Sequence, residues 1–111
     1  MPDGDDTGRR RRPAPVAVRN GLAEIADHIG AWRRLQGLTQ AQLAERAGID
    51  RKTLVALESS PGGTSLETVL RVARALGVLD SLTRALDPYE TEMGRLRADE
   101  RLPERVRPRR P

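Results

Sequence analysis

The sequence predicts an all-α fold built from five short helices, and three observations favour it. Aromatic residues make up only 2% of the 111 residues, and Phe is absent. The core must therefore come from aliphatic side chains, which favours packed helices over a sheet rich in aromatic residues. Between residues 22 and 87, apolar residues recur at the three-and-four spacing of one helical face. Glycines and helix-capping residues divide this stretch into segments of helical length.

The first two helices are delimited by local signals. The first is expected from Leu22 to a stop at Gly37. One face of it would consist of Leu22, Ile25, Ile29 and Trp32. Thr39 offers an N-cap to the second helix, and Gln42 completes a capping box three residues later. The inner face of the second helix would be Leu43, Ala44 and Ala47, with Gly48 as its end.

The remaining three helices follow the same logic. Asp50 is expected to cap the third helix, whose inner face is Leu54 and Leu57, and residues 59–64 have the composition of a loop. Ser65 is expected to cap the fourth. Its stripe would be Leu66, Val69, Leu70, Ala73 and Leu76, closed by Gly77. The fifth is expected from Asp80, with Asp80 and Ser81 at its N-cap, to Leu86, because the residue before Pro88 is biased away from helix.

The two ends lack this periodicity. Residues 1–21 are predicted to be a disordered basic arm, residues 22–87 the folded domain, and residues 88–111 an arginine-rich C-terminal tail that is flexible or folds on a partner. A short helix near residues 90–101 is the alternative for part of this tail. The run Arg9–Arg12 would lie along DNA phosphates or in the minor groove, or would only solubilise the chain. Residues 22–87 carry eight basic and eight acidic side chains, so the net charge of +4 lies in the ends.

Composition excludes several classes of function. The chain has no Cys, which excludes disulfides, thiolate metal sites and cysteine nucleophiles, and its single histidine, His28, cannot form a histidine zinc site alone. No metal, no cofactor and no catalytic site are expected. We expect His28 to be an ordinary surface or partly packed residue. No apolar stretch is long enough to span a membrane, and the acidic start of the chain does not resemble a secretory signal. The sequence therefore predicts a cytoplasmic protein that is not an enzyme and has no membrane partner.

The informative stretch is TQAQLAERAGIDRKTLVALE, residues 39–58. The small side chain of Ala44 permits two helices to approach closely, and Gly48 suits a turn that requires positive φ. This spacing of small residue, glycine and apolar residue is typical of two helices joined at a steep angle. With Leu54 and Leu57 inward, Arg51 and Lys52 would form an exposed, cationic first turn on the third helix.

Residues 29–77 resemble the helix-turn-helix domain of the Xre/Cro phage-repressor family. The resemblance rests on GLTQ at 37–40, LAERAGI at 43–49, Glu58 and LETVLRVARALGV at 66–78. It implies a lambda-repressor-like, five-helix DNA-binding domain that acts as a transcriptional regulator, with the third helix in the major groove. It also implies an internal ion pair between Arg33 and Glu58.

The resemblance assigns DNA-binding roles to seven residues. Arg51 and Lys52 would read base edges, and Gln40 would bind a phosphate and brace the first base contact. Thr53 and Ser59 would contact the DNA backbone. Val55 and Ala56 replace the polar residues often found at their positions, and either could contact a thymine methyl group.

Two partners other than a double-stranded DNA operator are expected. The first is a second copy of the chain, because a homodimer doubles the number of base pairs read. Leu79, Leu82 and Leu86 are the expected dimer surface, or else the lid of the core. Trp32 would cover an edge of the core or lie in a subunit interface. The second partner is a HipA-like kinase toxin, since the short length and arginine-rich tail are similar to HipB-like antitoxins. The alternative function is a protein-interaction module with little DNA affinity on the same scaffold.

Overall fold

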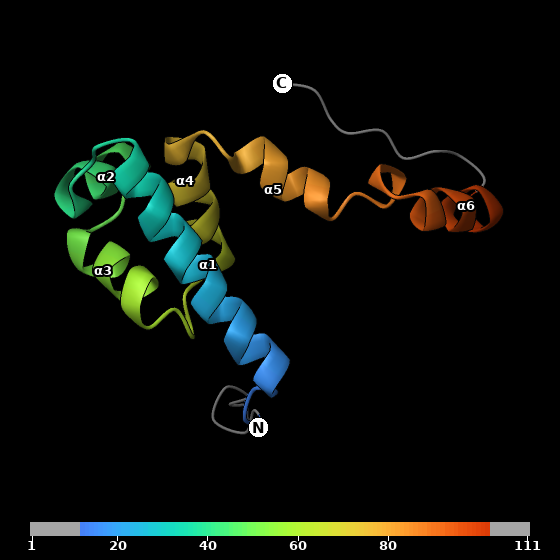
Figure 1. Cartoon of the computed structure of the whole chain (residues 1–111), viewed down its shortest axis with the longest axis horizontal. Helices are drawn as coiled ribbons and strands as arrows, with labels where there is room; N and C mark the ends of the chain where they lie inside the picture. Colours follow the sequence, from blue (N-terminus) through green and yellow to red (C-terminus); the bar gives the residue numbers. More distant parts are fainter. Residues whose placement is uncertain (1–11, 103–111) are drawn as a thin grey trace, which may run out of the picture.

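The structure, a computed structural model, describes residues 12–102. All secondary-structure elements in this range are helices (Figure 1). The prediction of an all-α fold is confirmed. The elements are α1 (Val16–Leu35), α2 (Gln40–Ala47), α3 (Arg51–Ser59), α4 (Leu66–Leu76), α5 (Leu79–Ala85), the 3₁₀ helix η2 (Pro88–Glu90) and α6 (Glu92–Arg101).

Helix α1 begins six residues before the predicted start at Leu22. Pro15 occupies its N-cap, and the backbone N–H groups of Val18 and Arg19 donate to the Pro15 carbonyl. Proline suits a helix start because its φ is already helical and the missing N–H has no partner there anyway. The sequence predicts that residues up to Gly21 belong to a disordered arm, but extending a helix that is already nucleated costs little free energy. Residues 1–11, with most of the arginine run, lie outside the described residues.

The core lies where α1, α2, α3 and α4 meet. Its fully buried large side chains are Leu43, Leu54, Leu57 and Val72. The second and third helices bury the residues that the sequence predicts. Two faces were predicted correctly only in part. On α4, Ala73 and Leu76 are buried as predicted, whereas Leu66 is exposed and Val72, outside the predicted stripe, is fully buried. On α1, Ile29 is buried as predicted and Ala26 is buried beside it, while Ile25 and Trp32 are 45% and 44% exposed.

Local capping signals decide most of the helix ends. The Thr39 hydroxyl accepts from the N–H of Gln42, and the Gln42 side chain accepts from the N–H of Thr39, so the predicted capping box is confirmed. Ser65 caps α4 as predicted. Asp50 stands at the N-cap of α3 without a side-chain bond to the helix. The predicted cap at Asp80 is wrong, because α5 already begins at Leu79 and Asp80 pairs with Arg84 inside it.

The C-terminal segment is more ordered than predicted. Asp87 caps η2 and Thr91 caps α6, so helical structure continues to Arg101, which agrees with the alternative of a short helix near 90–101 and not with a flexible tail over these residues. Gly94 packs so closely on the carbonyl of Pro88 that a Cβ atom would clash with it. Figure 1 shows α6 standing apart from the bundle of α1 to α4, beyond the end of α5. Residues 103–111 of the predicted tail lie outside the described residues.

Within residues 12–102, none of the helices combines the length and apolar character that crossing a bilayer requires.

Candidate nucleic-acid interface

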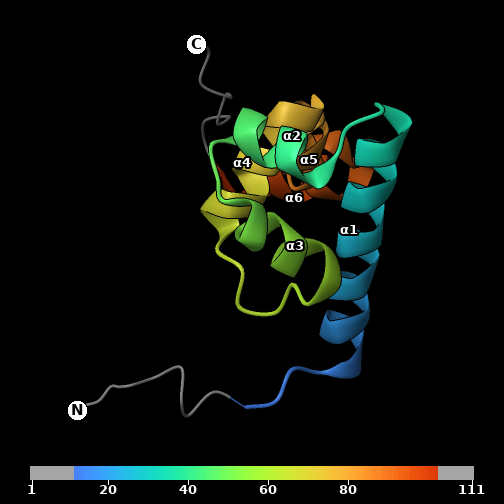
Figure 2. The same cartoon turned by 90° about the vertical axis from the view of Figure 1, so that its left-hand side faces the viewer.

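Helices α2 and α3 are joined by a tight turn with the features that the sequence predicts. Gly48 has a φ of 72°, a left-handed conformation that is free of strain only for glycine. The N–H of Ile49 donates to the carbonyl of Ala44 at 3.0 Å, which closes the turn. Ala44 is buried and small, so the two helices approach closely. Figure 2 shows α3 in front and below α2, beside α1. The turn therefore fixes the direction in which α3 leaves α2.

Helix α3 has an inner and an outer face. Leu54 and Leu57 are fully buried, whereas Arg51 and Lys52 in the first turn are exposed. The N-terminal end of a helix also carries a partial positive charge from its unpaired N–H groups. The first turn of α3 is thus an exposed cationic surface. Of the other predicted contacts on α3, Ala56 and Ser59 are exposed and Thr53 and Val55 are half-buried.

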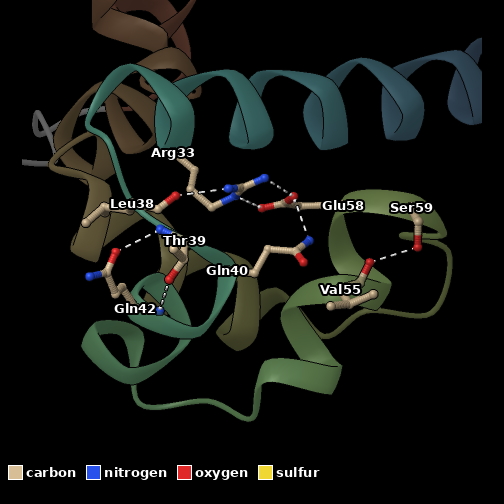
Figure 3. A network of polar contacts seen from close by, with 8 residues as sticks. All are labelled: Arg33, Leu38, Thr39, Gln40, Gln42, Val55, Glu58 and Ser59. Carbon is tan, nitrogen blue, oxygen red and sulfur yellow. Dashed lines mark hydrogen bonds and ion pairs between the residues drawn. The ribbon is translucent and has the colours of Figure 1, made fainter.

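A buried ion pair joins α1 to the end of α3. The Arg33 Nε donates to Glu58 Oε2 at 2.8 Å, and Arg33 Nη2 donates to Glu58 Oε1 at 3.1 Å (Figure 3). Only 14% of the Arg33 side chain and 10% of the Glu58 side chain are exposed. The structure therefore brings together the two residues that the family resemblance pairs. Such bidentate pairs are the stronger kind of salt bridge.

The same guanidinium and carboxylate hold two further parts of the motif. Arg33 Nη1 donates to the carbonyl of Leu38 at 2.9 Å, in the segment between α1 and α2. Gln40 Nε2, in the first turn of α2, donates to Glu58 Oε1 at 3.1 Å. Helices α1, α2 and α3 are therefore linked through one polar cluster, which we call the Arg33–Glu58 cluster (Arg33, Leu38 carbonyl, Gln40 and Glu58) (Figure 3).

Neither the Leu38 nor the Gln40 contact was anticipated from the sequence. The sequence predicts Gln40 at a DNA phosphate, and within the protein its half-buried side chain donates to Glu58. The bond to Glu58 uses one of the two amide hydrogens of Gln40, and the carbonyl oxygen of the Gln40 side chain takes no part in it. The only sequence signal for the Leu38 contact is its position directly after Gly37, whose positive φ turns the chain back toward α1.

Ser59 closes α3 on the side of the following loop. Its hydroxyl donates to the carbonyl of Val55 at 2.8 Å, one turn earlier in the helix (Figure 3). The hydroxyl oxygen still has acceptor capacity, and the residue is exposed.

The three leucines of the expected dimer surface differ in exposure. Leu79 and Leu82 are half-buried, while Leu86, just after α5, is 86% exposed. Helix α5 packs against α4, so part of its apolar surface already covers the core of its own chain. Helix α5 belongs to neither the α2–turn–α3 unit nor the Arg33–Glu58 cluster.

Comparison with known proteins gives related findings. Residues 29–79 match the family described as Helix-turn-helix. The chain is similar to an uncharacterized HTH-type transcriptional regulator of Methanothermobacter thermautotrophicus, with 51% identity over 45 residues, which are 40% of this chain and 65% of that protein. It is also similar to the uncharacterized HTH-type transcriptional regulator MJ0272 of Methanocaldococcus jannaschii, with 36% identity over 47 residues, 42% of this chain and 71% of the relative. The match to the first relative thus spans just under two thirds of its length. No solved structure matches the chain significantly.

Proposed function

This chain belongs to the helix-turn-helix family, and on that premise we propose that it binds double-stranded DNA and regulates transcription, as a repressor. One observation supports the proposal above the others. The first turn of α3 carries Arg51 and Lys52 on the exposed side, while the Leu54 and Leu57 side of the same helix is buried. In helix-turn-helix proteins the N-terminal residues of this second helix contact base edges in the major groove.

The proposed contacts divide into two kinds. Arg51 and Lys52 would read base edges, and an arginine can bind the O6 and N7 atoms of guanine together. Val55 and Ala56 would offer apolar contact to a thymine methyl group. Gln40, Thr53 and Ser59 would bind backbone phosphates, which fix the position of the protein without reading sequence. The Arg33–Glu58 cluster would act indirectly, because it holds the three helices in the arrangement that presents these side chains.

We further propose that the protein acts as a homodimer on a roughly palindromic operator. A single domain of this size reads few base pairs, and a two-fold dimer reads two half-sites about one helical turn apart. The sequence predicts Leu79, Leu82 and Leu86 as the dimer surface or as the lid of the core; Leu86 is exposed and Leu79 and Leu82 are half-buried.

A more specific role is that of a HipB-like antitoxin that pairs with a HipA-like kinase toxin and represses its own operon. The separate placement of α6 supports it, since a helix outside the domain is available to a protein partner (Figure 1). A reading frame for a kinase-like protein directly beside this gene, and co-purification of the two products, would support the pairing. Their absence would leave only the general regulator.

The balanced charge of residues 22–87 supports a second candidate function, a protein-interaction module with little DNA affinity. Eight basic and eight acidic side chains give this part of the chain no net attraction to phosphate. In that case α3 would face a protein, and the cationic first turn would bind an acidic surface.

Titration of the DNA upstream of the gene, measured by fluorescence anisotropy at two salt concentrations, tests the proposed function. A DNA-binding dimer with 6–10 phosphate contacts should lose about 10³–10⁵ in affinity between 50 and 200 mM salt. An unrelated duplex of equal length serves as the control and should bind more weakly at both concentrations. Absence of binding to either duplex at 50 mM salt would contradict DNA binding and favour the protein-interaction module.

A further inference from the structure

Helix α1 carries an exposed apolar face along its whole length. Val18, Ile25 and Trp32 follow one another at intervals of seven residues, and their exposed fractions are 51%, 45% and 44%. Leu35, at the end of the helix, is 77% exposed. Figure 2 shows α1 at the edge of the molecule with no other helix on its outer side, and Figure 1 shows the same helix in front of the others. Apolar side chains that are exposed at regular intervals along one side of a helix are typical of a helix that packs against a partner.

The spacing on this face is that of a helix packed against another helix. Val18, Ile25 and Trp32 occupy one position of a seven-residue repeat, and Gly21, His28 and Leu35 occupy the position three residues later. This alternation of three and four is the pattern by which two helices pack along a common seam. We call these six residues the α1 seam. It spans 18 residues, which is about 26 Å of helix.

We propose that the α1 seam binds the α1 seam of a second copy of this chain, with the two helices antiparallel. The proposal rests on the homodimer proposed above and names its contact surface. The residue numbers of two facing positions then add up to 53. Val18 faces Leu35 of the second copy, Gly21 faces Trp32, and Ile25 faces His28. Each of these layers occurs twice around the two-fold axis, as an isologous dimer requires.

Side-chain size favours the antiparallel direction. A Cβ atom added at Gly21 would have no heavy atom within 4 Å, so this position offers open space on the helix surface. Trp32 is the largest side chain of the α1 seam, and in the antiparallel pairing it covers the glycine of the other copy. In a parallel pairing glycine would face glycine and tryptophan would face tryptophan, which leaves a gap in one layer and crowds another. Packed interfaces tolerate neither.

Polar groups fit the same arrangement. Glu24 is exposed beside the α1 seam, and the antiparallel pairing brings it next to His28 of the second copy. A carboxylate accepts and an imidazole N–H donates, so the two can form a hydrogen bond. Antiparallel helices also place the positive end of each helix dipole beside the negative end of the other.

The size of α1 also favours this surface over α5. Stable interfaces use about 20–30 residues on each side. Helix α5 has seven residues, and two of its three leucines are partly buried against their own chain. Helix α1 has 20 residues, and the apolar residues of its seam remain largely exposed. The larger share of a two-fold contact therefore comes from α1.

Substitution at the centre of the α1 seam tests the proposal. Ile25→Lys should raise the dissociation constant of the dimer at least about tenfold in sedimentation velocity, because it buries an unpaired charge at the centre of the contact. Ile25 is already half-exposed, so the fold itself should tolerate the change, and circular dichroism checks this. Val16→Lys is the matched control, since Val16 is an exposed apolar residue of α1 outside the seam. It should leave the dimer unchanged.

Gly21→Leu gives a readout that unfolding cannot imitate. The added side chain has open space in the monomer and favours helix formation, so thermal stability at low concentration should stay equal or rise. The dimer should nevertheless weaken, because the leucine meets Trp32 of the second copy. Gly21→Leu combined with Trp32→Ala should restore dimerisation toward the wild-type level.

Crosslinking distinguishes the direction of the helices. The chain has no Cys, so single-cysteine variants are specific. His28→Cys should crosslink between copies with a short bismaleimide, whereas Leu35→Cys should not, since the two copies of residue 35 lie about 25 Å apart along the axis.

Three outcomes would overturn the proposal in distinguishable ways. A wild-type chain that stays monomeric at all concentrations would contradict both this surface and the proposed homodimer. A dimer that survives Ile25→Lys and Gly21→Leu but is lost on Leu86→Lys would contradict the α1 seam and leave the homodimer standing. Efficient crosslinking through Leu35→Cys alone would contradict the antiparallel arrangement. DNA binding by a monomer is measured separately by the salt titration above.

Discussion

Glu58→Ala should lower the free energy of unfolding by about 3–5 kcal/mol, the cost typical of breaking a buried ion pair by removing one partner. The variant leaves the Arg33 guanidinium in a site where only 14% of its side chain reaches solvent. Its one remaining protein bond there would be to the Leu38 carbonyl, and the Gln40 amide would lose the carboxylate it now contacts. Urea denaturation of the two proteins, followed by circular dichroism, measures the difference.

Glu45→Ala is the matched control for this prediction. Glu45 is an exposed glutamate of α2, and loss of an exposed charge changes stability by about 0–1 kcal/mol. The double variant Arg33→Met/Glu58→Leu should lose less stability than the two single variants together, because no charge is then left buried. Equal, small effects of Glu58→Ala and Glu45→Ala would show that the ion pair contributes little to the fold.

Arg51→Ala should weaken binding to the operator by about 1–3 kcal/mol for each half-site, the value of one good bidentate contact to a base pair. The operator is obtained by selecting duplexes from a random pool with the wild-type protein. Arg51 is exposed in the first turn of α3, so its loss should not alter the fold. Anisotropy titrations should show a weaker affinity and, in a set of single base-pair changes, a relaxed preference at one position of each half-site.

Arg74→Ala provides the control for this second prediction. Arg74 is an exposed arginine in the last turn of α4, outside the α2–turn–α3 unit. Its replacement by alanine removes the same charge as Arg51→Ala. It should reduce affinity slightly and equally for all duplexes. If Arg74→Ala and Arg51→Ala weaken binding to the same extent and with the same sequence profile, Arg51 contributes only its charge and does not read a base.

Local signals allowed most of the fold to be predicted, and tertiary contacts explain the rest. The Thr39 and Gln42 capping box and the Gly48 turn depend on residues within one turn of each other, so their sequence pattern suffices. Which side of a long helix is buried depends on what packs against it. Helix α1 has apolar residues on more than one face, and the core includes the predicted Ile29 and also Ala26, while Ile25 and Trp32, which periodicity also favoured, are 45% and 44% exposed.

The helix near residues 90–101 is only an alternative in the sequence, for a related reason. Residues 88–101 contain few apolar side chains, so periodicity gave no signal. Their structure depends instead on two caps, Asp87 and Thr91, and on the close approach of Gly94 to Pro88. In a single sequence, a glycine that is needed because a backbone carbonyl packs closely against it cannot be distinguished from a glycine that breaks a helix.

The candidate interface was partly predictable as well. The burial of Leu54 and Leu57 follows from helical spacing, and it places Arg51 and Lys52 on the outer side. The pair of Arg33 and Glu58 came only from the family resemblance, since 25 residues separate them in sequence. The bond between Gln40 and Glu58 depends on the angle between α2 and α3, which no local pattern encodes.

The central claim is that the first turn of α3 enters the DNA. Chemical-shift mapping of backbone amides by NMR, during titration of the full chain with a selected operator duplex, tests it most directly. We expect the largest shifts at Arg51, Lys52 and Thr53 and at Gln40 in the first turn of α2, with small shifts along α4. Shifts confined to other elements, with those of Arg51 and Lys52 unchanged at saturation, would contradict the account.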